Sequence, residues 1–137
     1  MTHTTTSDTT ALETTYQTAS AALTALQDEQ AGMAQSWAVA VALGDSDQLV
    51  TLETRARELP TRLAMARLTY AKAGLAWSKA VCYALETHYA ANPQPIVSAV
   101  DTGGLSQPMM PDDIAMARMR LRGFHEAHDQ ALREAQR

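Results

Sequence analysis

The sequence predicts an all-α protein: a long, coiled-coil-like antiparallel helical hairpin that a third, C-terminal helix completes into a three-helix bundle. Two apolar stripes with alternating three- and four-residue spacing run in opposite directions from a short segment of turn residues, Ala40–Asp47. Such spacing is typical of one helix face packed on another helix. A third stripe of the same kind lies at the C-terminal end, after a segment rich in Pro and Gly.

The chain is short enough for a single domain, with 137 residues. We expect a flexible N-terminal tail at residues 1–9, because this Thr-rich stretch has few side chains to bury. One helical domain, 10–137, follows. It consists of a hairpin at 11–91, a loop at 92–110 and a C-terminal helix at 111–136.

The first helix is expected over about 11–43. Thr10 followed by Glu13 fits a capping box, in which each side chain bonds a free backbone amide of the first turn. Gln30 interrupts the apolar stripe, either as a solvated residue in the seam or as a device that selects register or partner. The stripe consists of Leu12, Tyr16, Ala19, Leu23, Leu26, Met33, Trp37 and Ala40.

Gly44 is expected to end the first helix in the left-handed conformation, and Asp45 or Ser46 to cap the second. Facing residues of a hairpin with this turn have numbers that sum to about 89. This register places Trp37 against Leu52 or a neighbour, Trp77 near Leu12, and Glu29 near Arg62.

The second helix is expected over about 47–90, with a kink at Pro60, since proline removes one backbone hydrogen bond. Beyond the kink it carries a second apolar row that the first helix cannot cover. The row consists of Met65, Leu68, Leu75, Cys82 and Leu85.

The third helix is expected over about 112–135, started by Pro111, Asp112 and Asp113. We expect it to fold back antiparallel on the second half of the second helix and to cover its second row. Gly123, inside this helix, suggests close approach of a neighbouring helix. The covering residues are Ile114, Leu121 and Phe124.

The loop at 92–110 is either a binding segment or a linker, because structureless connections of this length are uncommon in compact domains. Its Asp101-Thr102-Gly103 tripeptide is similar to the signature of aspartic proteases. That chemistry needs a strand-rich fold, so we interpret the tripeptide as a turn.

The charge pattern contains no cluster of basic residues of the kind that binds nucleic acid. The net charge is −4, and the first Lys or Arg is Arg55, so no basic block is present. Contact with nucleic acid is therefore expected only within a larger complex. No membrane span or targeting segment is evident, and we expect a cytoplasmic protein or one in a particle assembled there.

The sequence offers only weak candidates for a metal site. His125, His128 and Asp129 have helical spacings of three and four, but no further ligand is evident. Cys82 is the single cysteine and is expected to be a buried thiol. We therefore predict no catalytic residues, no metal and no cofactor.

The sequence favours a non-enzymatic interaction or assembly protein, which is a subunit, adaptor or scaffold of a larger complex such as a virion or a bacterial nucleoprotein assembly. It would contact a protein partner or form homo-oligomers. One alternative is a metal- or ligand-binding bundle, and another is an acidic inhibitor or regulator that docks on a basic partner. The predicted partner contacts are Leu68, Leu75, Met109, Met110, Met116 and Met119.

Overall fold

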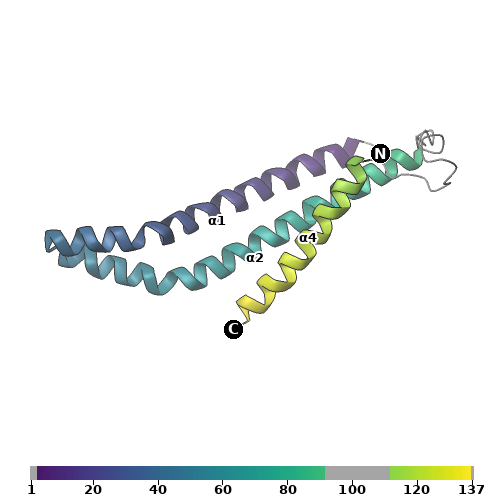
Figure 1. Cartoon of the computed structure of the whole chain (residues 1–137). Coiled ribbons are helices and arrows are strands. Elements are labelled where there is room, and N and C mark those ends of the chain that lie inside the picture. Colours follow the sequence, from purple (N-terminus) through teal and green to yellow (C-terminus); the bar gives the residue numbers. More distant parts are fainter. Residues whose placement is uncertain (1–2, 92–111, 137) are drawn as a thin grey trace, which may run out of the picture.

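The structure, a computed structural model, describes residues 3–91 and 112–136. These ranges form three helices and no strand: α1 (His3–Leu43), α2 (Ser46–Ala91) and α4 (Asp112–Ala135). Figure 1 shows α1 and α2 side by side as a long antiparallel hairpin, with α4 folded back obliquely across the second half of α2 and its C-terminal end pointing away from the hairpin. The predicted all-α three-helix fold is confirmed.

The turn forms where the sequence predicts it. Gly44 has a positive φ of 65° and ends α1. The amide of Gly44 donates to the Val41 carbonyl, and that of Asp45 donates to the Ala40 carbonyl, so the last carbonyls of α1 are satisfied. Asp45 then caps α2, because its carboxylate accepts a hydrogen bond from the amide of Gln48 at 3.1 Å.

The start of α1 differs from the prediction. The helix begins at His3, so Thr10 lies inside it and cannot cap its first turn. Once a helix is nucleated, each further residue adds one backbone bond, and weak helix formers can extend it. Thr14 and Thr18 also donate their hydroxyls to carbonyls one turn earlier, which keeps these polar groups satisfied on the helix surface. The flexibility predicted for residues 1–9 stays a prediction.

The second helix continues through Pro60 as one element, as predicted. It bends in its first half, the half that contains this proline (Figure 1). A bend is expected there because proline cannot donate to the carbonyl of Ala56.

Contacts across the seam between α1 and α2 lie within about one helical turn of the predicted pairs. Leu23, Leu59 and Leu63 form a buried cluster, and Tyr16, one turn after Leu12, stacks on Trp77 with 4.9 Å between ring centroids. Trp37 lines a groove together with Ala56, one turn beyond Leu52.

Glu29 and Arg62, which are predicted to lie near each other, each have a different ionic partner. Glu29 pairs with Arg55, about two helical turns earlier on α2, at 2.5 Å. Arg62 pairs instead with Glu58, one turn away on its own helix, at 3.2 Å. A partner within one turn needs less ordering of the arginine side chain than one across the seam.

Helix α4 packs antiparallel on the second half of α2, as predicted. Asp113 at its start accepts a hydrogen bond from Tyr89 near the end of α2, and Glu134 near its end lies 3.7 Å from Arg67. Ala131 is buried against Leu68. Leu68 and Cys82 of the second row are thus buried and Leu75 and Leu85 half-buried within the same chain, whereas Met65 is 52% exposed.

The close approach between α2 and α4 lies at a different glycine from the predicted one. A Cβ atom on Gly74 would lie 2.2 Å from the Phe124 ring, whereas one on Gly123 would meet nothing within 4 Å. The interpretation of Gly123 is therefore wrong. Phe124 needs the space that Gly74 leaves free, since a protein interior has little room for an added methyl group.

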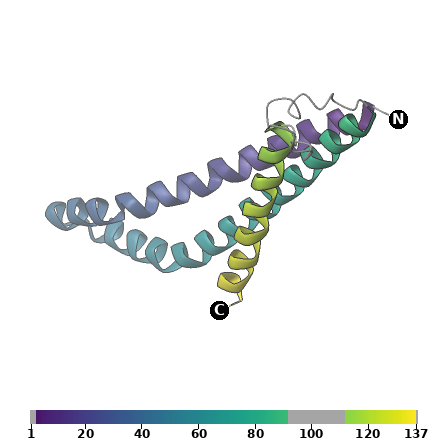
Figure 2. The same cartoon turned by 45° about the vertical axis from the view of Figure 1, so that its right-hand side comes forward.

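The molecule divides into two parts along its long axis. The three-helix part comprises residues 3–29, 61–91 and 112–136, and the distal hairpin comprises residues 30–60, where α1 and α2 pair alone (Figure 2). Ala135, the last residue of α4, shares a small surface pocket with Pro60, which marks the boundary. The predicted loop 92–110 lies outside the described residues. Among those described, no helix is long and apolar enough to cross a membrane.

Candidate functional site

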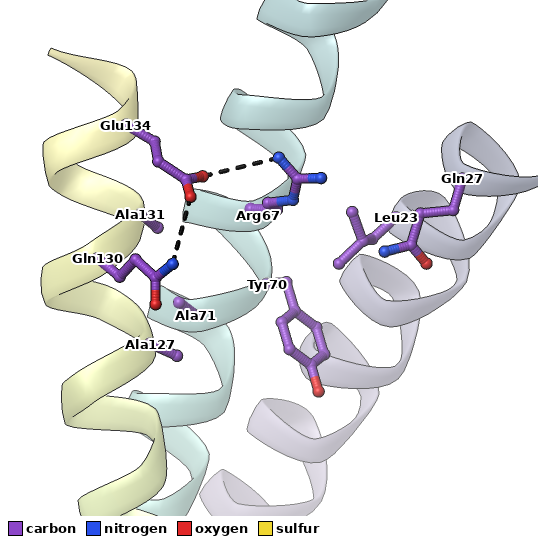
Figure 3. A pocket seen from close by; sticks show the side chains of 9 residues that line it. All are labelled: Leu23, Gln27, Arg67, Tyr70, Ala71, Ala127, Gln130, Ala131 and Glu134. Atoms are coloured by element: carbon purple, nitrogen blue, oxygen red, sulfur yellow. Dashed lines mark hydrogen bonds and ion pairs between the residues drawn. The ribbon is translucent and has the colours of Figure 1, made fainter. Parts of the chain in front are cut away.

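A groove lies where the three helices meet, and Figure 3 shows the side chains around it. Its volume is about 470 Å³. Small apolar side chains form its base, and longer polar ones stand at its edge. The lining residues are Leu23, Gln27, Arg67, Tyr70, Ala71, Ala127, Gln130, Ala131 and Glu134.

The charges in this three-helix groove compensate one another. The Glu134 carboxylate lies 3.7 Å from the Arg67 guanidinium and accepts a hydrogen bond from the Gln130 amide at 3.5 Å (Figure 3). General acid–base or nucleophilic chemistry needs a poised titratable group or an activated nucleophile. Among the lining residues, the Glu134 carboxylate is held by Arg67 and Gln130, and the Tyr70 hydroxyl is hydrogen-bonded to that of Tyr16.

An aromatic cluster holds the three helices together next to this groove. Tyr16 of α1 lies 5.5 Å from Phe124 of α4 in an edge-to-face arrangement, and its hydroxyl is 3.0 Å from that of Tyr70. This hydrogen bond, together with burial, raises the pKa of Tyr70 to about 12. The guanidinium of Arg120 lies 5.3 Å from the centre of the Trp77 ring. These contacts fix α4 to the hairpin.

Two unusual polar groups lie in the packed face of α2. Ser78 is 2% exposed, and its hydroxyl has no hydrogen-bond partner among the described residues. Cys82 is a buried free thiol, as predicted, and burial raises its pKa, with Glu86 adding to the effect. A thiol with a raised pKa is a poor nucleophile at neutral pH, so this cysteine is suited to packing.

The distal hairpin has a different surface. Trp37 is 42% exposed, Val41 is 54% exposed and Leu43 is 75% exposed. The stretch from Gln30 to Leu43 contains no charged residue on any side of the helix. Apart from the exposed Gln30, Gln35 and Ser36 its side chains are apolar, and only α2 covers this end of α1. This surface is the most unusual feature of the described chain.

A second groove runs along this surface on one side of the hairpin. We call it the distal groove. Its volume is about 510 Å³, and no charged side chain lines it. The lining residues are Gln30, Met33, Ala34, Trp37, Ala56, Leu59 and Pro60.

The structure places the weak metal candidates on α4 without bringing further ligands to them. His125 and Asp129 are exposed, and His128 is half-buried. Within residues 3–91 and 112–136, no group of three or more His, Cys, Asp or Glu side chains is placed to hold a metal ion.

The predicted partner contacts are divided between buried and exposed positions. Leu68 is buried in a cluster with Ala131 of α4, and Leu75 is half-buried. Leu68 is therefore not available to a partner in this fold. Met116 and Met119 of α4 are exposed, 55% and 64% respectively. Met109 and Met110 lie outside the described residues.

Comparisons with known proteins give no relative. No family model, curated protein or solved structure matches the chain.

The sequence interpretation missed the distal surface, although a signal for it was available. The stripe analysis assigned Met33, Trp37 and Ala40 to the seam and drew no conclusion from the other side chains of this stretch. The absence of charge from Gln30 to Leu43 could have identified it, because a solvated helix face normally carries charged residues.

Proposed function

We propose that this chain is a non-enzymatic interaction protein, a subunit, adaptor or scaffold of a larger assembly, and that its distal hairpin is the protein-contact surface. One observation carries the proposal: the exposed, uncharged apolar surface of α1 from Gln30 to Leu43. Soluble monomeric proteins rarely expose large apolar patches, and where such a patch is present it marks a contact site.

The energetics support a contact function. Fully burying a Val or Leu side chain contributes about 1.5–3 kcal/mol relative to leaving it exposed. Trp37 and Val41, on one side of α1, are 42% and 54% exposed, so a partner that covered this side would gain a few kcal/mol. The three-helix part has its own packed aromatic cluster, and we propose that it holds the hairpin rigid while the distal end binds.

The proposed setting is an assembly such as a virion or a bacterial nucleoprotein particle. Long helices that leave one end uncovered suit a subunit whose contacts are completed by neighbours. Any contact with nucleic acid would come through other components, since the net charge of −4 does not attract phosphates.

Sedimentation velocity and pull-down experiments test this function. The purified chain should either self-associate or retain a protein from a lysate of its source cells. A Val41→Glu/Leu43→Glu double variant should lose that association, because it places carboxylates in an apolar contact. Thr24→Glu, at an exposed position of α1 in the three-helix part, is the matched control and should retain it. Circular dichroism should show equal helicity for all three proteins.

A chain that sediments as a compact monomer, and retains no protein that the double variant loses, would rule out the proposed function.

A further inference from the structure

We propose that the partner of the distal hairpin is a second copy of this chain. Two distal hairpins pack antiparallel about a two-fold axis, and each places its α1 in the distal groove of the other. This inference rests on the proposed function and names the partner of that same surface.

The distal groove adjoins the end of α4. On α1, Leu23 and Gln27 line the three-helix groove beside α4, and Ala34 lines the distal groove. The spacings of four and seven residues place these three on one face of the helix. On α2, Pro60 lines both the distal groove and the pocket that contains Ala135. The distal groove therefore begins where α4 ends, and a helix in it would cover the part of the hairpin that α4 does not reach.

The chemistry of the groove selects an uncharged helix as its occupant. A partner helix with charged side chains would leave them desolvated and unpaired against Ala34, Trp37 and Val41. The segment Gln30–Leu43 of a second copy has the matching surface, with no charge on any side. The other long uncharged stretch of the described chain, Thr14–Gln27, exposes mainly Thr, Gln and Ala side chains, which are largely polar.

Small side chains permit the close contact that such a dimer needs. Ala31, Ala34 and Ala38 are all exposed on α1. Helices with small residues at their contact approach to about 8 Å between axes, the lower end of the usual range. Trp37 lies at the edge of this alanine surface and can cover the contact from solvent.

The end of α4 sets the register. The stretch Gln30–Leu43 is about 21 Å long at 1.5 Å per residue. If the two-fold axis passes between Trp37 and Ala38, the partner's turn at Gly44 reaches the level of Ala31. Ala135 stands next to Pro60 at the near end of the groove, so the partner's turn cannot slide further. The contact is closed and forms a dimer, because a two-fold interface uses the same surface on both copies.

Two matched variants test which side of α1 makes the contact. Val39 and Val41 are similarly exposed, at 50% and 54%, but point about 200° apart on the helix. Val41 follows Ala34 and Trp37 along the groove side, whereas Val39 lines a separate pocket on the other side with Gly32 and Leu43. Sedimentation equilibrium should show a dimer for the unaltered chain. Val41→Glu should raise the dimer dissociation constant at least about 100-fold, and Val39→Glu should leave it within about 3-fold.

Disulfide formation tests the antiparallel register. In a Cys82→Ser background, Ala34→Cys of one copy should lie opposite Val41→Cys of the other. Oxidation of a mixture of these two single variants should yield the mixed disulfide, and each variant alone should give little, since a disulfide requires Cα atoms within about 7 Å. A mixture of Thr24→Cys with Val41→Cys is the control and should not cross-link. Cross-linking of each single variant with itself would indicate a parallel contact and overturn the proposal.

The remaining outcomes separate this inference from the proposed function. A monomer at all concentrations that still captures a different protein through Val41 overturns the homodimer and leaves the contact function standing. A dimer that Val41→Glu and Val39→Glu weaken equally, or not at all, means that another surface makes the contact, and the proposal is wrong. A monomer with no captured protein rejects both.

Discussion

The three-helix part and the distal hairpin are built from the same two helices, yet their surfaces differ. In the three-helix part, Tyr16, Tyr70 and Phe124 are packed together, and the exposed side chains of α1 are mainly Thr, Gln and Ala. In the distal hairpin, Trp37 and Leu43 are exposed and charge is absent from the end of α1. The difference is one of charge: where the third helix is present, exposed apolar side chains such as Met116 and Met119 lie among charged residues such as Arg118 and Arg120. Where it is absent, apolar surface is left over, and we infer that another chain supplies the cover.

The largest expected difference between the two parts is in how much the free energy of unfolding falls when an apolar side chain is removed. Phe124→Ala should lower the free energy of unfolding by about 3–5 kcal/mol, because Phe124 is 9% exposed and joins α4 to the hairpin. Leu43→Ala should change it by less than about 0.5 kcal/mol, since Leu43 is 75% exposed. Urea denaturation followed by circular dichroism measures both. Equal costs would mean that the distal hairpin is as tightly covered as the three-helix part.

A glycine-to-alanine substitution should also change stability in opposite directions in the two parts. Gly74→Ala should destabilise the protein by about 1–3 kcal/mol, because the added methyl group would overlap the Phe124 ring. Gly32→Ala should stabilise it by up to about 1 kcal/mol, since the space around Gly32 is open and alanine favours helix. Thermal unfolding of the two variants gives the signs. If Gly74→Ala were stabilising, the close packing of α4 on α2 would be in error.

A pH titration sharpens the comparison at the aromatic cluster. The hydrogen bond that Tyr70 shares with Tyr16 raises the pKa of Tyr70 from 10.0 to about 12, so the folded state retains a proton that the unfolded state loses. Stability from this group is therefore fully present below pH 10 and is lost between about pH 10 and 12. The denaturant midpoint of the Tyr70→Phe variant should fall less steeply with pH over this window than that of the unaltered protein. An identical decline in both proteins would mean that Tyr70 has no raised pKa.

The smallest expected effect concerns Ser78 in the packed face of α2. Its hydroxyl is buried without a partner among the described residues, so Ser78→Ala should raise the free energy of unfolding by about 1 kcal/mol. Ser36→Ala, at an exposed position of the distal hairpin, should have an effect below about 0.5 kcal/mol. A loss of stability in Ser78→Ala would show that the hydroxyl is hydrogen-bonded in the protein.

The sequence by itself determined the helices and the turn, because these depend on local chemistry. The three- and four-residue spacing predicted α2 and α4 to within a residue or so at their ends, and Gly44 with Asp45 set the turn between α1 and α2. The return of α4 onto α2 was also predictable, since an apolar row containing Leu68 and Cys82 had to be covered.

Only the tertiary structure decided which side chains pair between helices and how far along the hairpin α4 extends. Glu29 pairs with Arg55 rather than Arg62, and Phe124 packs on Gly74 while Gly123 faces open space. Repeating stripes allow several partners one or two turns apart, and the choice depends on side-chain reach and on the bend of α2. The exposed end of α1 likewise depends on where α4 stops. Ala135 ends beside Pro60, and the apolar side chains beyond that point have no third helix to cover them.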